Sequence, residues 1–178
     1  AHSNEAMMRN LLKKLTAVIS QYLIAQFQAG AHVVQLFDSW GGMLDESQYR
    51  LWSLPYVEQI VRELHAVGCP VIFYVGNSAH LLPALETTCA NAISLDWRVP
   101  LARAEDVLGA NKTIQGNLSP AALFGTTADV DGRARSMLSK LKRRNRFIAN
   151  LGHGVLQTTL PENVAAFVAA IRKGWSDS

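Results

Sequence analysis

The chain has 178 residues, of which 49% are hydrophobic and 17% are charged, and its formal net charge is +3. This balance is typical of a globular domain with a buried core and excludes an intrinsically disordered chain. No apolar run reaches the roughly 18 residues that a membrane-spanning helix needs, and the opening residues AHSNEAMMRN do not place an apolar stretch behind a basic one, so we predict a cytoplasmic protein without a membrane segment.

Residues 5–28 have the periodicity of a helix that ends before Gly30. Large apolar side chains recur on one face of this helix at intervals of four, three and four positions: Leu11, Leu15, Val18 and Tyr22. This spacing predicts that the face is buried against a sheet.

Five apolar segments follow, and each precedes a helical segment. The segments expected as strands are residues 33–37, 70–75, 92–95, 112–115 and 146–149. Helices are expected to begin near Ser53, His80, Pro100, Thr127 and Pro161. Residues 70–75, PVIFYV, are apolar throughout, which indicates a strand covered on both faces. The alternation predicts the α/β class, with a parallel sheet of five βα units in a single unit over residues 1–178.

Several strand segments end abruptly in polar residues. In QLFDSWGG, residues 35–42, Asp38 and Ser39 follow the strand and two glycines permit a turn. The last strand runs into NLGHG, residues 150–154, which carries His153. Because ligands bind at the carboxyl ends of the strands in parallel α/β folds, we predict a ligand site formed by these side chains.

The sequence leaves several roles open for these three side chains. Ser39 lacks the G-x-S-x-G surroundings of a nucleophile elbow, so hydrogen bonding to a ligand or stabilising the turn competes with nucleophilic catalysis. His153 lies between two glycines, and an imidazole can donate or accept a proton, so it either exchanges protons with a ligand or hydrogen-bonds its own loop. Asp38 either orients a neighbour, acts as an acid or base, or caps the turn.

The remaining aromatic and histidine residues divide into ligand contacts and packing residues. Trp40 and Trp97 each follow a strand end, where they are placed to flank a flat ligand. Trp52 and Trp175 lie on expected helices and are expected to be packing residues, and His32, His65 and His80 are expected to be structural.

The sequence indicates neither a metal or cofactor site nor a nucleic-acid partner. Cys69 and Cys89 are isolated in apolar segments, so we expect two buried free thiols rather than a disulfide or a zinc site. No phosphate-binding or dinucleotide-binding glycine pattern is present. A basic cluster near the expected fifth strand fits either an anion site or a solvated helix end, and its lack of interleaved aromatic residues favours the solvated end. The cluster consists of Lys140, Lys142, Arg143, Arg144 and Arg146.

Several motifs, in the same order and spacing, resemble the uroporphyrinogen decarboxylase family. They are QLFDSWGG, Leu54-Pro55-Tyr56, SLDWRV (94–99), QGNLSP (115–120), NLGHG and PENVAAFV (161–168). The resemblance implies an eight-stranded (β/α)8 TIM barrel, of which this chain holds the last five βα units and the helix before them. It also implies an enzyme without metal or organic cofactor that removes the four acetate carboxyls of uroporphyrinogen III, giving coproporphyrinogen III in heme and tetrapyrrole biosynthesis.

The resemblance further implies roles for particular residues. Ser39 and His153 match catalytic residues that bind and orient the porphyrinogen, and Phe37 and Asp38 match substrate-binding residues of the adjoining wall. The family chemistry protonates a pyrrole carbon, so that the ring accepts the electrons left by CO2. The family's arginine-rich R-Q-A-G-R-Y segment, and the aspartate and tyrosine of its cleft, have no counterpart here, so the chain is expected to be inactive without the amino-terminal strands.

Two alternatives accompany this interpretation. Five βα units leave two open sheet edges, which fits a non-catalytic half-barrel that binds or assembles, either as a homodimer or with a complementing amino-terminal half-barrel. Zinc-dependent methyltransferases that act on methylated corrinoid proteins share the barrel, but they carry His-x-Cys where this chain has Phe73 and Val75.

Overall fold

The computed structural model describes residues 4–176 as an α/β structure built on one parallel sheet. Its strands are β1 (Val34–Asp38), β2 (Val71–Val75), β3 (Ala92–Leu95), β4 (Thr113–Leu118) and β5 (Phe147–Leu151). They pair in chain order and every pairing is parallel, which confirms the predicted fold class. Within the described residues, β1 and β5 each pair on one side only, so the sheet has two edges.

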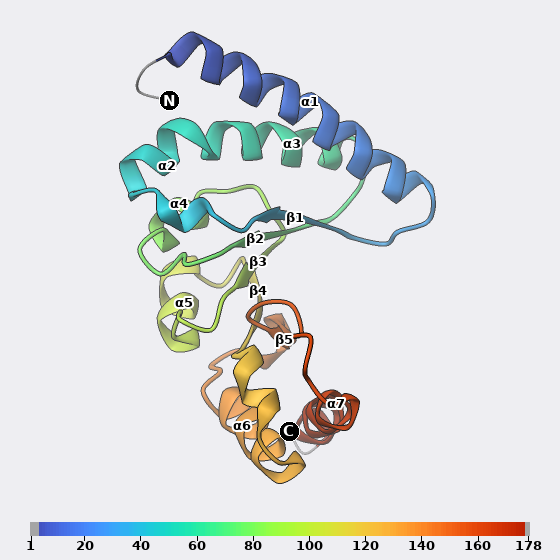
Figure 1. Cartoon of the computed structure of the whole chain (residues 1–178). Coiled ribbons are helices and arrows are strands. Elements are labelled where there is room, and N and C mark those ends of the chain that lie inside the picture. The colour runs from blue at the N-terminus through green and yellow to red at the C-terminus, as the bar shows by residue number, and fades with distance from the viewer. Residues whose placement is uncertain (1–3, 177–178) are drawn as a thin grey trace.

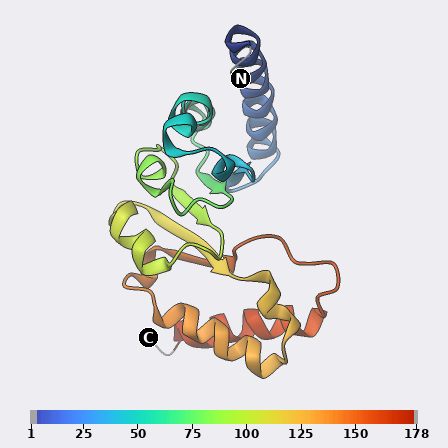
Figure 2. The ribbon, with the colours of Figure 1, turned by 60° about the vertical axis from the view of Figure 1, so that its left-hand side comes forward.

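The helices are α1 (Glu5–Gln28), α2 (Glu46–Trp52), α3 (Leu54–Ala66), α4 (Leu82–Glu86), α5 (Leu101–Leu108), α6 (Thr127–Ser139) and α7 (Pro161–Ser176). Short 3-10 turns occupy Gly41–Met43, Pro120–Phe124 and Arg144–Arg146. In Figure 1, α1 and α3 lie beyond one end of the row of strands and α6 and α7 beyond the other. Figure 2 shows α6 and α7 running side by side, and the two helices pack against each other.

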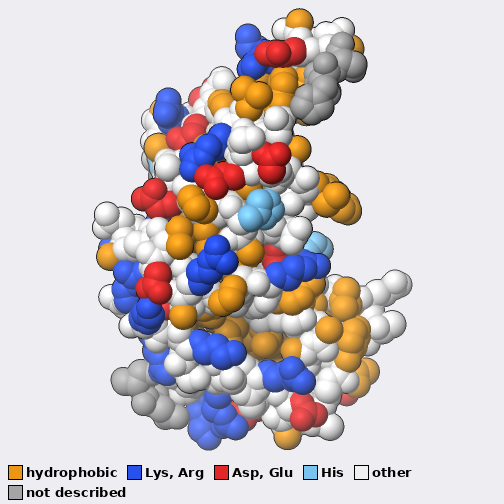
Figure 3. Space-filling model, turned by 90° about the vertical axis from the view of Figure 1, so that its left-hand side faces the viewer, with side chains coloured by type: hydrophobic (Ala, Val, Ile, Leu, Met, Phe, Trp, Pro, Cys, Tyr) orange, Lys and Arg blue, Asp and Glu red, His pale blue; other side chains and the backbone are white. Residues whose placement is uncertain are grey.

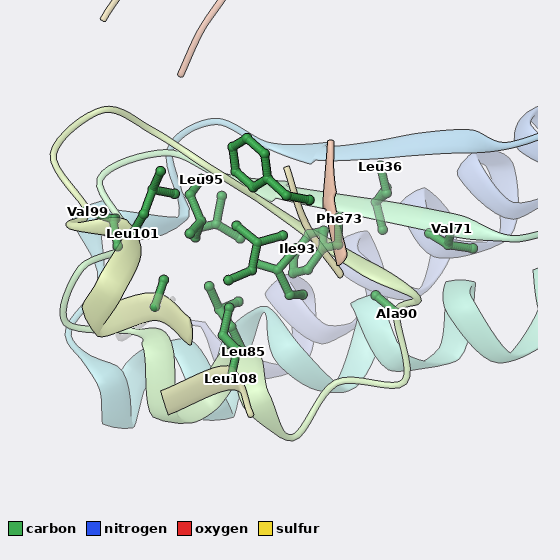
Figure 4. Close-up of a cluster of buried hydrophobic side chains, with 14 of the residues drawn as sticks. Leu36, Val71, Phe73, Leu85, Ala90, Ile93, Leu95, Val99, Leu101 and Leu108 are labelled. Atoms are coloured by element: carbon green, nitrogen blue, oxygen red, sulfur yellow. The ribbon is translucent and has the colours of Figure 1, made fainter. Parts of the chain in front are cut away.

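The core lies between the helices and one face of the sheet (Figure 4). Strand register places one row of apolar side chains straight across the five strands: Leu36, Phe73, Ile93, Ile114 and Phe147. Every member of the row is buried. Because side chains alternate along a strand, the residues between them point to the opposite face, which is where the candidate site lies.

The bounds of α1 agree with the predicted helix, but the prediction of its buried face is wrong. Val18 and Tyr22 are each 64% exposed, and Leu11 and Leu15 are also exposed. The buried positions are instead Thr16, Ser20 and Leu23. The helix carries apolar residues on more than one face, and it packs on α3 with a face that the spacing alone did not identify.

Two short helices depart from the sequence prediction. Helix α2 was not expected, and its N-cap is Asp45, whose carboxylate accepts a hydrogen bond from the Gln48 backbone N–H at 2.9 Å. Helix α4 spans only Leu82–Glu86 rather than starting at His80. The His80 ring instead contacts the Leu44 carbonyl at 2.8 Å, in keeping with its predicted structural role.

Cys69 is a buried free thiol as expected, whereas Cys89 is exposed, so the prediction of two buried thiols is wrong for Cys89. The backbone N–H of Cys89 donates to the Glu58 carboxylate at 2.9 Å in an exposed turn after α4. An apolar sequence context therefore did not make this residue part of the core.

The basic cluster begins only after α6 has ended at Ser139, and it is held against α5. The buried Glu105 carboxylate accepts hydrogen bonds from the backbone N–H groups of Lys142 and Arg143, each at 2.8 Å. Figure 3 shows how Lys and Arg side chains are spread among hydrophobic ones over one face of the molecule. None of the described helices combines the length and apolarity needed to cross a bilayer.

Candidate functional site

The carboxyl ends of three strands bring the predicted residues Phe37, Ser39 and His153 together with Tyr74. Phe37 lies on β1 and Ser39 directly after it, Tyr74 lies on β2, and His153 follows β5. Two adjoining hollows, of about 400 and 490 Å³, open here, and Ser39, Tyr74 and His153 line both. Ser39 and His153 are 114 positions apart in the sequence and follow the two edge strands, β1 and β5, yet both line the same two hollows.

Three rings form a continuous aromatic line across the site. The Phe37 and Tyr74 ring centroids are 5.7 Å apart, and those of Tyr74 and His153 are 6.1 Å apart with the rings nearly perpendicular. Phe37 remains 63% exposed. The site therefore offers the apolar rings of Phe37 and Tyr74 beside the imidazole of His153.

Tyr74 also fixes the loop that carries His153. Its phenol O–H donates to the Gly152 carbonyl at 3.2 Å, and burial raises the pKa of Tyr74, with the Asp96 carboxylate as the second cause. Gly152 lies so close to the backbone of Trp97 that a Cβ atom at this position would collide with it. The NLGHG loop thus packs on the turn after β3 through Gly152 and is hydrogen-bonded to β2 through the Tyr74 phenol.

Two polar side chains that line the 400 Å³ hollow, Gln35 and Ser94, are both hydrogen-bonded to Gln115 on β4. The Gln115 side-chain amide donates to the Gln35 side-chain oxygen at 3.1 Å and to the Ser94 hydroxyl at 2.9 Å. Ser94 and Gln115 are almost fully buried. Because these groups hydrogen-bond one another, the exposed rings of the 400 Å³ hollow are the groups that a ligand would contact.

Asp38 is not brought together with Ser39 and His153. Its carboxylate faces the helices, where it accepts a hydrogen bond from the Ser53 hydroxyl at 2.7 Å. Burial, followed by the Asp38 charge, raises the pKa of the neighbouring Tyr49. The reason is strand alternation, which turns Asp38 to the side opposite Phe37 and Ser39.

The tryptophans lie where the sequence placed them. Trp40 is 79% exposed and Trp97 39% exposed, and both line the 490 Å³ hollow. Trp52 is buried in the core region, and Trp175 stacks on Phe147 with centroids 6.3 Å apart.

Two site residues, Tyr74 and Arg98, were missed by the sequence analysis. Tyr74 pairs in register with Phe37, and a polar tip inside an otherwise apolar strand was a usable signal. Arg98 follows β3 and lines the 490 Å³ hollow with Ser39 and His153. The only indication of Arg98 in the sequence was a positively charged side chain close to the end of an expected strand. Among residues 4–176, no group of three His, Cys, Asp or Glu side chains is arranged to hold a metal ion.

The sequence matches the family model of uroporphyrinogen decarboxylase over residues 1–174. Curated proteins named uroporphyrinogen decarboxylase are similar to it along most of its length. The Myxococcus xanthus protein is 40% identical over 168 residues, the Koribacter versatilis protein 43% over 155, and the Trichlorobacter lovleyi protein 36% over 163.

These alignments cover 94%, 86% and 92% of this chain but only 48%, 44% and 48% of the respective relatives. The chain therefore spans about half the length of the curated relatives it matches. Among solved structures, a Listeria monocytogenes protein described as a vitamin-B12-independent methionine synthase superposes with a TM-score of 0.69 at 12% identity. That superposition covers 96% of this chain and 56% of the other, and at this identity the likeness concerns the fold alone.

Proposed function

The chain belongs to the uroporphyrinogen decarboxylase family, and from that membership we propose that it forms the carboxyl-terminal wall of a site that decarboxylates uroporphyrinogen. The observation that carries the proposal is the gathering of Phe37, Ser39, Tyr74 and His153 around two adjoining hollows at the carboxyl ends of the strands. A tetrapyrrole offers flat apolar rings and polar edges, which suit an aromatic line flanked by a hydroxyl and an imidazole.

Each residue has a distinct part in this proposal. Phe37 and Tyr74 contact the pyrrole rings, while Ser39 and His153 hydrogen-bond the tetrapyrrole and orient it. Asp38 faces away from the ligand and acts by fixing the end of β1 through Ser53. Ser39 is a binding residue and not a nucleophile.

The chemistry requires a proton and a polarised ring. Protonation of a pyrrole carbon makes the ring electron-poor, the bond between the acetate methylene and its carboxyl carbon breaks, and the electron pair passes into the ring as CO2 leaves. A second proton then converts the methylene into a methyl group, and loss of the first restores the pyrrole. Positioning and charge stabilisation supply most of such a rate enhancement.

The 178 residues hold no counterpart of the family's arginine-rich segment, so we propose that this chain is inactive by itself. The test compares the purified chain with a fusion that joins it to the amino-terminal half of the Koribacter versatilis relative. Both are incubated anaerobically with uroporphyrinogen III, and the oxidised products are separated by number of carboxyl groups.

The fusion is expected to produce porphyrins with fewer carboxyl groups, and the isolated chain is not. His153→Ala in the fusion is the matched control and is expected to lose most of the turnover. A fusion that folds but converts nothing would contradict the proposed decarboxylase function. Turnover by the isolated chain would contradict only the need for the other half of the barrel.

A second candidate function is that of a non-catalytic half-barrel that assembles with itself or with a complementing chain. The observation in its favour is the exposure of large apolar side chains next to the site, notably Trp40 at 79% and Met43 at 74%. In either case we propose a cytoplasmic location, where the exposed Cys89 thiol stays reduced.

A further inference from the structure

Arg98 stands at the mouth of the candidate site and has no role in the function proposed so far. It follows the end of β3, and its side chain is 52% exposed. It lines the 490 Å³ hollow together with Ser39, Trp40 and His153. A cation therefore shares a cavity with the groups proposed to hold the tetrapyrrole.

The position of the Arg98 guanidinium is fixed by two neighbours. The guanidinium carbon lies 4.2 Å from the centroid of the Trp97 ring, which is the geometry of a cation–π contact. The guanidinium is also 3.6 Å from the Asp96 carboxylate. The contact with the Trp97 ring and the adjacent opposite charge both restrict the rotamers of the side chain, so the cation is preorganised.

Asp96 holds the cation without consuming its hydrogen-bond donors. The carboxylate is fully buried and accepts hydrogen bonds from the backbone N–H of Asn77 and, at 2.7 Å, from the backbone N–H of Arg98. The distance of 3.6 Å to the guanidinium is longer than a hydrogen bond. The guanidinium N–H groups on the hollow side thus remain available to a ligand.

We propose that Arg98 binds a peripheral carboxylate of the tetrapyrrole and so adds an anion-binding residue to this half of the site. The inference rests on the proposed function, since uroporphyrinogen carries a carboxylate on every peripheral side chain. A guanidinium matches a carboxylate in a bidentate manner, which a lysine ammonium does not. The chain thereby contributes a cation of its own to a site that must accept a strongly anionic ligand.

The experiment measures the affinity of the 178-residue chain for uroporphyrin III by the quenching of tryptophan fluorescence, to which Trp40 and Trp97 at the site contribute. Arg98→Gln is expected to weaken binding by about tenfold at low salt, the effect of losing a charge-assisted hydrogen bond. The affinity of Arg98→Lys is expected to lie between those of wild type and Arg98→Gln, because lysine keeps the positive charge but cannot bind a carboxylate in the bidentate manner of a guanidinium. The matched control is Arg62→Gln, which removes a cation that is 73% exposed on α3 and paired with Glu58; its affinity should stay within about twofold of wild type.

A salt series separates ligand binding from a structural role. If Arg98 contacts a carboxylate, the difference between wild type and Arg98→Gln shrinks as the salt concentration rises. The proposal would be overturned if the difference in affinity did not depend on salt and Arg98→Lys bound no better than Arg98→Gln. It would also be overturned if a folded Arg98→Gln chain bound uroporphyrin III with wild-type affinity.

His153→Ala distinguishes the failure of this inference from the failure of the proposed function. Weak binding by His153→Ala together with unchanged binding by Arg98→Gln would reject only the role of Arg98. An absence of uroporphyrin binding by the wild-type chain would reject the tetrapyrrole site and the Arg98 role with it.

Discussion

Tyr74 is the residue that connects the end of β2 with the loop carrying His153. Replacing it by phenylalanine removes the hydrogen bond to the Gly152 carbonyl and keeps the ring contacts with Phe37 and His153. We expect Tyr74→Phe to lower the free energy of unfolding by about 1 kcal/mol and to weaken porphyrin binding a few-fold. Urea denaturation and fluorescence titration measure the two effects.

The control for this prediction is Tyr22→Phe on α1, where the side chain is 64% exposed and the effect should stay within about 0.5 kcal/mol. Equal losses in both variants would contradict the special position of Tyr74. Burial, followed by the Asp96 charge, raises the pKa of Tyr74, so this side chain also gives stability a pH dependence. Its contribution to stability is full below the ordinary value of 10.0 and is lost as the pH rises through the folded value, so Tyr74→Phe should flatten this alkaline loss.

Gly42 marks the point where the turn after β1 packs against the end of β2. Its N–H donates to the Gly76 carbonyl at 3.1 Å, and a Cβ atom here would overlap the carbonyl oxygens of Gly76 and Asn77. We expect Gly42→Ala to lower the free energy of unfolding by more than about 2 kcal/mol and to displace the turn that carries Trp40. Urea denaturation measures the loss.

Gly132 supplies the matched control, because it lies inside α6 with no atom near the place of a Cβ. Alanine there should stabilise the chain by about 0.5–1 kcal/mol. If Gly42→Ala and Gly132→Ala changed the free energy of unfolding in the same direction, the close approach at Gly42 would not be the cause of the loss.

At the scale of single residues, strand alternation explains which site predictions the structure brings together. Ser39 and His153 were found from their positions at strand ends, whereas grouping Asp38 with them ignored the alternation that turns it toward Ser53. The place of Arg98 depends on how the chain turns after β3 and how Trp97 supports it, and no local pattern encodes that path.

At the scale of elements, helix α6 depends on a capping box at its amino terminus. The Thr126 hydroxyl accepts from the Asp129 N–H at 3.2 Å, and the Asp129 carboxylate accepts from the Thr126 N–H at 2.9 Å. We expect Thr126→Ala to lower the free energy of unfolding by about 1 kcal/mol at neutral pH. Urea denaturation measures this loss, and Ser136→Ala on the exposed side of α6 is the control.

The same box predicts an acid dependence. Hydrogen bonds from the Thr126 hydroxyl and then its backbone N–H lower the pKa of Asp129 below the ordinary 3.8. The resulting stability is present above that ordinary value and is lost as the pH falls through the lower, folded value. The gap in stability between wild type and Asp129→Asn should therefore narrow in acid, and a constant gap would contradict the assignment.

Helix and strand positions were largely predictable because apolar periodicity and proline mark them, as the bounds of α1 and β3 show. The buried face of α1 was not predictable, since Leu15 and Leu23 are equally apolar and only the packing on α3 decides which is buried. Helix α2 was missed because the only signal at its start is the N-cap residue Asp45, and the helix is only seven residues long.

At the scale of the whole molecule, the chain spans about half the length of its relatives, and its described residues form five parallel strands with two sheet edges. The parallel sheet follows from strict alternation of strand and helix, but the strand order does not, because doubly wound sheets alternate in the same way; the sequential order was implied only by the resemblance to a barrel family. The shape of the site was not predictable in the same way, because its hollows are bounded by loops from β1, β2, β3 and β5 whose paths depend on one another.

The exposed apolar stripe of α1 leads to a prediction about association. Large side chains at successive turns of the helix remain in contact with solvent: Met7, Leu11, Leu15, Val18 and Tyr22. Apolar patches of this kind mark interaction surfaces, and burying them gains about 25 cal/mol per Å². We therefore expect the purified chain to self-associate with increasing concentration, as measured by light scattering.

Two pairs of lysine substitutions on α1 test whether this stripe is responsible. Val18→Lys with Tyr22→Lys places charge in the stripe and should shift the chain toward the monomer, because a lysine ammonium is costly to bury. Ala17→Lys with Gln21→Lys adds the same charge to the neighbouring face and should leave association nearly unchanged. If the wild-type chain stays monomeric at every concentration, the prediction of a homodimer is wrong. The exposed stripe would then be a surface for a complementing chain.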